Sequence, residues 1–206
     1  MVEMFRYLAD NPVWIVALVA TAILTVFVCI KAAQASSKRY AANEKTIKKI
    51  KEENALCNEF SILTENLIAS AQADRLFKGV ALNLQKKISD ADDMVSAFNA
   101  LSEEQRDIYA LSFVLEDGES ALSNFFRANG QPLTGASLSA VKKLFSKDVC
   151  VVFEKEYNAF DSDNETVSFI PEEIAMLDSE FSQLLSSEEL CSVAGAYIKE
   201  NHKKFI

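Results

Sequence analysis

The stretch SEEQRDIYALSFVLED, residues 102–117, carries both the start signal and the apolar spacing of an amphipathic helix. Ser102 and Gln105 form a capping-box sequence, in which each side chain accepts a hydrogen bond from the backbone amide of the other residue. Ile108, Leu111 and Leu115 repeat at helical spacing, which predicts one buried face. The sequence therefore predicts a helix from Ser102 to about Asp117 that packs against a core.

Comparable helix signals lie on both sides of this stretch. Ser186 and Glu189 repeat the start signature, and Pro171 suits the first turn of another helix. Asn129-Gly130 predicts a left-handed stop after a short helix. The chain has only five Gly and three Pro, and no alternating β-branched strands are evident. We therefore predict an all-α fold in which about 130 residues build one core.

Part of this pattern resembles a known family. The matching residues are the segment 101–111 (LSEEQRDIYAL), Phe125-Phe126, Asn129-Gly130, Leu177-Asp178, Phe181, Leu190, Tyr197-Ile198 and Phe205. Over residues 95–206 the chain resembles the bacterial DNA-mimic-protein domain family. The resemblance implies an acidic helical domain that binds a protein. It also implies two features of the best-known type, a homodimer and surface carboxylates that imitate DNA phosphates.

The N-terminal region holds a long apolar run, VWIVALVATAILTVFVCI, at residues 13–30. No charged residue occurs from Asn11 to Ile30, and twenty helical residues span about 30 Å, the thickness of a bilayer core. We predict a short tail over 1–11 and a single transmembrane helix over 12–33. A cleaved signal peptide is an alternative because Ala33-Gln34-Ala35 has the pattern of a cleavage site. The length of the run and Lys31 favour the anchor, and a buried soluble helix is the third possibility.

Basic residues predict the orientation of this span. Only Arg6 precedes it, whereas seven basic residues follow it: Lys31, Lys38, Arg39, Lys45, Lys48, Lys49 and Lys51. Because Lys and Arg accumulate on the cytoplasmic side, we predict a single-pass protein of the cell membrane with its N-terminus outside and its C-terminal domain in the cytoplasm. The same basic cluster is expected to contact membrane lipid. One of the four cysteines, Cys29, lies within the apolar run. The other three, Cys57, Cys150 and Cys191, are an odd number and widely spaced, which fits a reducing compartment.

Charge divides the chain into two unlike parts. Residues 1–51 hold eight basic and three acidic residues, net +5, and residues 52–206 hold thirteen and twenty-seven, net −14. We predict a basic-to-acidic helical stalk over 34–78, with Leu56, Phe60, Leu63 and Leu67 on one helix face, and a compact domain over 79–206. Packing of this face on the domain is favoured over a coiled coil. The acidic domain is not expected to bind nucleic acid directly, and its expected partner is a basic protein.

Motifs for catalysis, metal binding or cofactor binding were not found, so the sequence predicts no enzyme, no metal and no cofactor. Asp161, Asp163, Glu165 and Glu172 fit a calcium-loop register, but Thr166 stands where the loop needs Gly. A flexible acidic connection between helices is the preferred interpretation.

The sequence predicts a membrane-anchored protein-binding or regulatory module. Its candidate interaction surface is acidic and comprises Glu116, Asp117, Glu119, Asp161, Asp163 and Glu165. Two alternatives stay open: an exported acidic domain released by signal cleavage, and an enzyme that uses unrecognised carboxylates.

Overall fold

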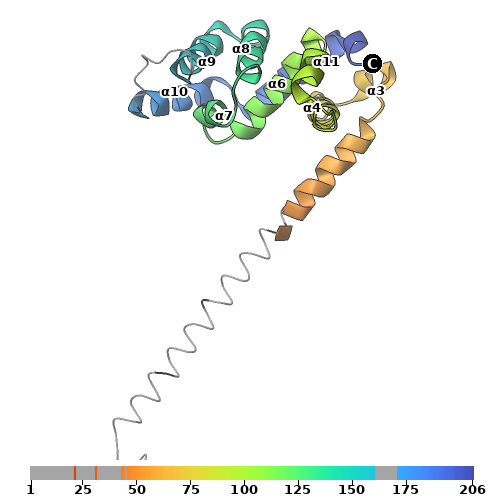
Figure 1. Cartoon of the computed structure of the whole chain (residues 1–206), viewed down its shortest axis with the longest axis horizontal. Helices are drawn as coiled ribbons and strands as arrows, with labels where there is room; N and C mark the ends of the chain where they lie inside the picture. The colour runs from red at the N-terminus through yellow and green to blue at the C-terminus, as the bar shows by residue number, and fades with distance from the viewer. Residues whose placement is uncertain (1–20, 22–30, 32–42, 45, 161–170) are drawn as a thin grey trace, which may run out of the picture. The chain divides into compact units, whose positions relative to one another are not determined.

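A computed structural model describes residues 21, 31, 43–44, 46–160 and 171–206. The secondary structure in these ranges is helical without strands, which confirms the all-α prediction (Figure 1). A helix covers 46–59. The helices that follow are α3 (Glu65–Ser70), α4 (Ala73–Ser89), α5 (Met94–Asn99), α6 (Glu103–Asp117), α7 (Leu122–Ala128), α8 (Leu133–Leu144), α9 (Lys147–Phe160), α10 (Pro171–Leu184), α11 (Ser187–Glu200) and the 3-10 turn η1 (His202–Lys204).

The chain divides into two compact units, Met1–Glu52 and Glu53–Ile206, and we call the second unit the head. Residues 53–78, which the sequence assigned to the stalk, thus lie in the head. The predicted start of the domain, residue 79, lies inside α4. A Cβ atom at Gly79 would approach the Phe60 ring to 2.1 Å. The absence of a side chain at this position therefore makes room for a core aromatic ring.

The helix starts predicted from capping sequences are confirmed. At α6 the Ser102 hydroxyl accepts from the Gln105 amide (3.2 Å), and the Ser102 amide donates to the Gln105 side chain (3.1 Å). Ile108 and Leu111 are fully buried, and Leu115 is partly buried against the core. At the next predicted start, the Ser186 hydroxyl accepts from the Glu189 amide (3.1 Å), and α10 begins at Pro171.

Two local predictions need correction. Leu56, Phe60, Leu63 and Leu67 do not share one helix face, because the first helix ends at 59 and Thr64 caps a separate helix α3 by accepting from the Leu67 amide. The left-handed stop at Asn129-Gly130 is wrong, because Asn129 is extended (φ −126°) and neither residue has positive φ. The Asn129 side chain instead donates to the Phe125 carbonyl (2.9 Å), which satisfies the end of α7 without a left-handed residue.

The core of the head is built around α4, α6 and α11. The most extensive pairing joins α4 to α11, where Gly195 lies directly against the Ala73 carbonyl. A Cβ atom at Gly195 would come within 2.1 Å of that oxygen, so the two backbones approach closely. On the other side of α6, aromatic side chains from α7, α9 and α10 pack together, namely Phe125, Phe126, Phe153 and Phe181.

The apolar run that predicts a membrane anchor lies almost wholly outside the described residues, which include only Thr21 and Lys31 of the stretch 12–33. Among the helices that the structure does describe, none combines the length and the apolar character that a bilayer crossing needs. The transmembrane helix therefore stays a prediction from sequence.

Candidate functional site

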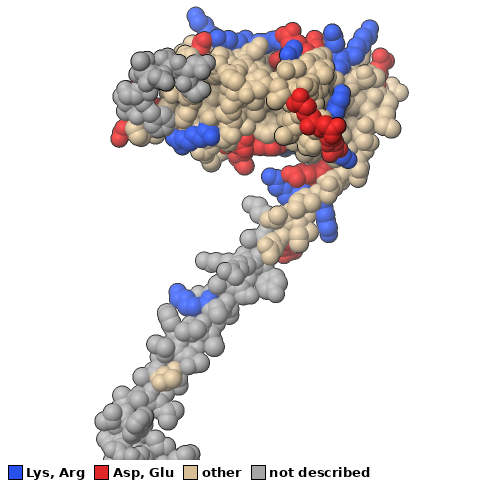
Figure 2. Space-filling view, in the orientation of Figure 1, with Lys and Arg blue, Asp and Glu red and all other residues tan. Residues whose placement is uncertain are grey.

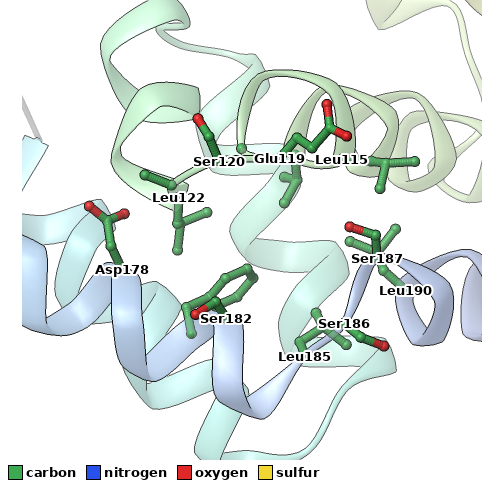
Figure 3. Close-up of a pocket in the computed structure, with 14 residues that line it drawn as sticks. Leu115, Glu119, Ser120, Leu122, Asp178, Ser182, Leu185, Ser186, Ser187 and Leu190 are labelled. Atoms are coloured by element: carbon green, nitrogen blue, oxygen red, sulfur yellow. The ribbon is translucent and has the colours of Figure 1, made fainter.

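A pocket of about 140 Å³ opens between the α6–α7 turn, α10 and the start of α11 (Figure 3). Its floor is apolar and is formed by Leu115, Leu122, Phe181, Leu185 and Leu190. Its lining also includes the polar residues Ser120, Ser182, Ser186, Ser187 and Glu119, and Figure 3 shows the Glu119 carboxylate directed away from the leucines. The site therefore combines an apolar floor with a polar and acidic surround.

A glycine and a distant aspartate fix the shape of this pocket. Gly118 ends α6, and a Cβ atom there would lie 2.4 Å from the Val114 carbonyl oxygen, so the turn tolerates no side chain. Asp178 of α10 then accepts from both the amide and the hydroxyl of Ser123 (2.8 Å each) at the start of α7. Because this carboxylate satisfies an amide in the first turn of α7, it ties the α6–α7 turn to α10.

The two segments that line the pocket carry charges of one sign. Segments 114–122 and 178–190 supply its lining and contain no Lys, Arg or His, but they carry seven carboxylates: Glu116, Asp117, Glu119, Asp178, Glu180, Glu188 and Glu189. Figure 2 shows acidic and basic side chains interspersed over one face of the head. The absence of basic residues from the two lining segments is thus a local feature of the head's charge pattern.

The predicted acidic surface is placed only in part. Glu116 and Glu119 are exposed near the end of α6, whereas Asp117 is half-buried and accepts from Asn129 Nδ2 (2.8 Å). Glu116 accepts from Gln85 Nε2 (3.2 Å). Of these three residues, Glu119 lines the pocket. The remaining predicted residues, Asp161, Asp163 and Glu165, lie outside the described residues.

A second acidic residue near the pocket is fully buried. Glu156 of α9 is 0% exposed, and neither of its carboxylate oxygens has a hydrogen-bond partner among the residues that the structure describes. Burial and the nearby charge of Asp178 raise the pKa of Glu156 to about 8, against the opposing effect of Arg127. Glu156 is therefore held mainly in its protonated form at neutral pH.

A contrasting cluster joins α6, α8 and α11. Asp107, which is 2% exposed, accepts from Lys143 Nζ (2.6 Å) and from the Tyr197 hydroxyl (3.0 Å), and Lys143 also contacts Glu103 (2.5 Å). Burial opposes the charged form of Lys143, but its hydrogen bonds to Asp107 and Glu103 raise its pKa overall. Burial, followed by the charge of Asp107, raises the pKa of Tyr197 to about 12. The groups satisfy one another, which indicates a structural role.

Neither Asp178 nor Glu156 was among the predicted site residues, although Asp178 belongs to the residues that carry the family resemblance. Glu156 follows Val149, Val152 and Phe153 at spacings of seven, four and three residues, so helical periodicity alone places it on the buried face. Asp178 carries no comparable signal, because its partner Ser123 is 55 residues away. Within the described ranges, no group of three or more potential ligands is arranged to hold a metal ion, and Glu172 of the calcium-loop register is exposed at the start of α10.

Comparisons of this chain with protein-family models, with curated proteins and with solved structures found no match. The resemblance to the DNA-mimic-protein domain family therefore stays a prediction.

Proposed function

We propose that this protein is a membrane-anchored protein-binding module whose head captures a basic partner at the pocket beside Glu119. The observation that carries this proposal is an apolar pocket whose two lining segments carry acidic residues and no basic ones. Interfaces concentrate binding energy in a few side chains that enter such pockets, while charged edges steer the encounter. An acidic surround favours a partner with a basic surface.

The size of the pocket supports a protein partner over a small-molecule substrate. Small-molecule sites usually enclose about 300–1,000 Å³, whereas a cavity of about 150 Å³ holds one benzene-sized group. At about 140 Å³, this pocket accommodates one side chain. The rest of the binding energy would come from contacts on the surrounding surface.

Membrane anchoring is supported by the sequence of residues 12–33 and by the basic residues that follow it. In this proposal the anchor holds the head at the cytoplasmic face, so that a captured partner becomes concentrated at the membrane. Restricting both proteins to one surface raises the effective concentration of the partner.

A DNA-mimic role is a more specific version of the same function. It is favoured by the family resemblance and by the carboxylates at Glu116 and Glu119, which are exposed near the pocket. The partner would then be a DNA-binding protein, and duplex DNA would compete with the head for it.

Affinity capture from solubilised membranes tests the proposal. The full-length tagged chain is compared with the double variant Glu116→Lys, Glu119→Lys and with a control, Glu200→Lys, at an exposed position near the C-terminal end of α11. We expect one or more basic proteins to be retained by the wild-type chain and the control and lost from the double variant. Equal retention by all three chains would contradict the proposal.

A further inference from the structure

We infer that the pocket seats a single Lys or Arg side chain from a basic segment of a partner protein, with the aliphatic stem on the leucine floor and the cationic end beside Glu119. This inference rests on the proposed function and extends it, because it names the chemistry of the anchoring side chain. Two independent properties of the pocket support it, its shape and its charge.

The shape fits a long, unbranched side chain. The floor leucines come from three different elements: Leu122 from α7, Leu185 from the α10–α11 turn and Leu190 from α11 (Figure 3). Lys and Arg bury their methylene stems against apolar surfaces of this kind while the charged end stays in water. A volume of about 140 Å³ leaves room for one such stem.

The charge pattern selects a cation beside the apolar floor. Glu119 is exposed and is one of the residues that line the pocket, and the lining segments 114–122 and 178–190 contain no Lys, Arg or His. The positive end of the α11 helix dipole opposes the binding of a cation at this site. Glu188 and Glu189 stand in the first turn of α11 and offset that effect.

Other occupants fit less well. A carboxylate or phosphate entering the pocket would meet Glu119 and the acids of α11, and the Ser186 hydroxyl already accepts from the Glu189 amide. An apolar side chain would fill the floor but leave the acidic surround without a counter-charge. A basic side chain satisfies both parts of the site.

Methyl NMR of the full-length chain in maltoside detergent, labelled at leucine, tests this assignment. The probes are the N-acetyl, N-methylamide derivatives of lysine, arginine, norleucine and glutamate. We expect the lysine and arginine probes to shift the methyl signals of Leu122, Leu185 and Leu190, with the norleucine probe about fivefold weaker and the glutamate probe inactive, since one exposed ion pair is worth up to about 1 kcal/mol. Equal binding of lysine and norleucine probes, or no shift with lysine, would overturn the inference.

Three variants distinguish binding in the pocket from non-specific attraction of a cation to the acidic head. Glu119→Lys should weaken the lysine probe about fivefold, and Ser182→Trp should abolish the shifts by filling the pocket without changing charge. Glu200→Lys makes the same charge change about 20 Å along α11 from Ser187 and should bind like the wild type. Unchanged methyl dispersion in each variant confirms folding, and an unaffected Ser182→Trp would overturn the assignment.

The two proposals fail in different ways. If partner capture depends on Glu116 and Glu119 but the lysine probe does not bind, the anchoring side chain is wrong and the proposed function stands. If the lysine probe binds but capture is insensitive to these residues, the proposed function fails.

A peptide of residues 43–51 tests whether the basic partner is a second copy of this chain. If this peptide binds much more tightly than its scrambled version, a second copy is the better partner and the assignment to another protein is overturned.

Discussion

Two buried acids in the head have opposite environments. Asp107 lies between α6, α8 and α11 and is contacted by Lys143 and Tyr197. Glu156 lies on α9, and within the described part of the chain both of its oxygens lack a hydrogen-bond partner. Both side chains are almost inaccessible to water, at 2% and 0% exposure. The two acids are equally buried but differ in their partners.

Moving a charged group out of water costs free energy. An opposite charge and hydrogen bonds offset this cost at Asp107. At Glu156 the charge of Asp178 raises the pKa, and the charge of Arg127 lowers it by a smaller amount. Binding a proton is then the cheaper solution, and the pKa rises. Four measurements test this contrast.

The largest expected effect is on the pH dependence of stability. The folded pKa of Glu156, about 8, lies above its ordinary value of 4.5, so its proton stabilises the folded state fully below pH 4.5, and this stabilisation is lost as the pH rises through 8. Between pH 5 and 8 we expect the free energy of unfolding to fall by about 3 kcal/mol more in the wild type than in Glu156→Met. Urea unfolding at several pH values measures this difference, and parallel pH profiles would contradict it.

Removing the cation beside Asp107 has the next largest effect. Lys143→Met keeps the stem but leaves Asp107 with only Tyr197, so we expect a loss of about 2 kcal/mol, less than for a fully buried pair because Lys143 is one-third exposed. Thermal unfolding measures the loss. The matched control is Lys142→Met, in which both Lys142 and its partner Glu154 are almost half exposed, and it should cost less than about 1 kcal/mol. Equal losses would remove the distinction.

The sequence predicts these two clusters unequally. The capping box at Ser102 and the spacing of Ile108 and Leu111 lie within one helix, so α6 was predictable from local rules. The inward position of Glu156 also follows from helical periodicity, but a carboxylate on that face conflicts with the usual preference for exposed acids. Whether Glu156 has a partner depends on the side chains that α7 and α10 place around it. The sequence of α9 alone does not contain this information.

The pocket was still less predictable. It joins segments 114–122 and 178–190, which meet because Asp178 holds the start of α7 through Ser123. Glu119 was identified only as one acidic residue in a larger predicted set. The apolar floor beside it results from tertiary packing, whereas the composition of the chain shows only its net charge.

Replacing the unpaired acid itself should stabilise the head. Glu156→Met exchanges a buried carboxyl without partners for a flexible apolar side chain of similar length. We expect a gain of about 1.5 kcal/mol at pH 7 in urea unfolding. Glu154→Met, two residues earlier and partly exposed, is the control and should change stability by less than about 1 kcal/mol. A loss of stability in Glu156→Met would show that this acid has a stabilising partner.

The smallest effect concerns the second contact of Asp107. Tyr197→Phe removes one hydrogen bond of 3.0 Å while Lys143 still neutralises the carboxylate. We expect a cost of about 1 kcal/mol in thermal unfolding. In a Lys143→Met background, Tyr197→Phe should lower the stability by a larger amount, because Asp107 would then lose both of the described partners. Simple additivity of the two changes would indicate that the contacts act independently.

The close approach of Gly195 to the Ala73 carbonyl also has a consequence for biosynthesis. The helix that covers α4 most extensively is α11, more than 100 residues later in the chain. During translation, α4 leaves the ribosome long before this covering helix exists. At about 5–20 residues per second, that interval lasts on the order of 10 s, during which the apolar face of α4 lacks its main cover. Nascent chains of this protein are therefore expected to depend on chaperones until residues 187–200 have emerged.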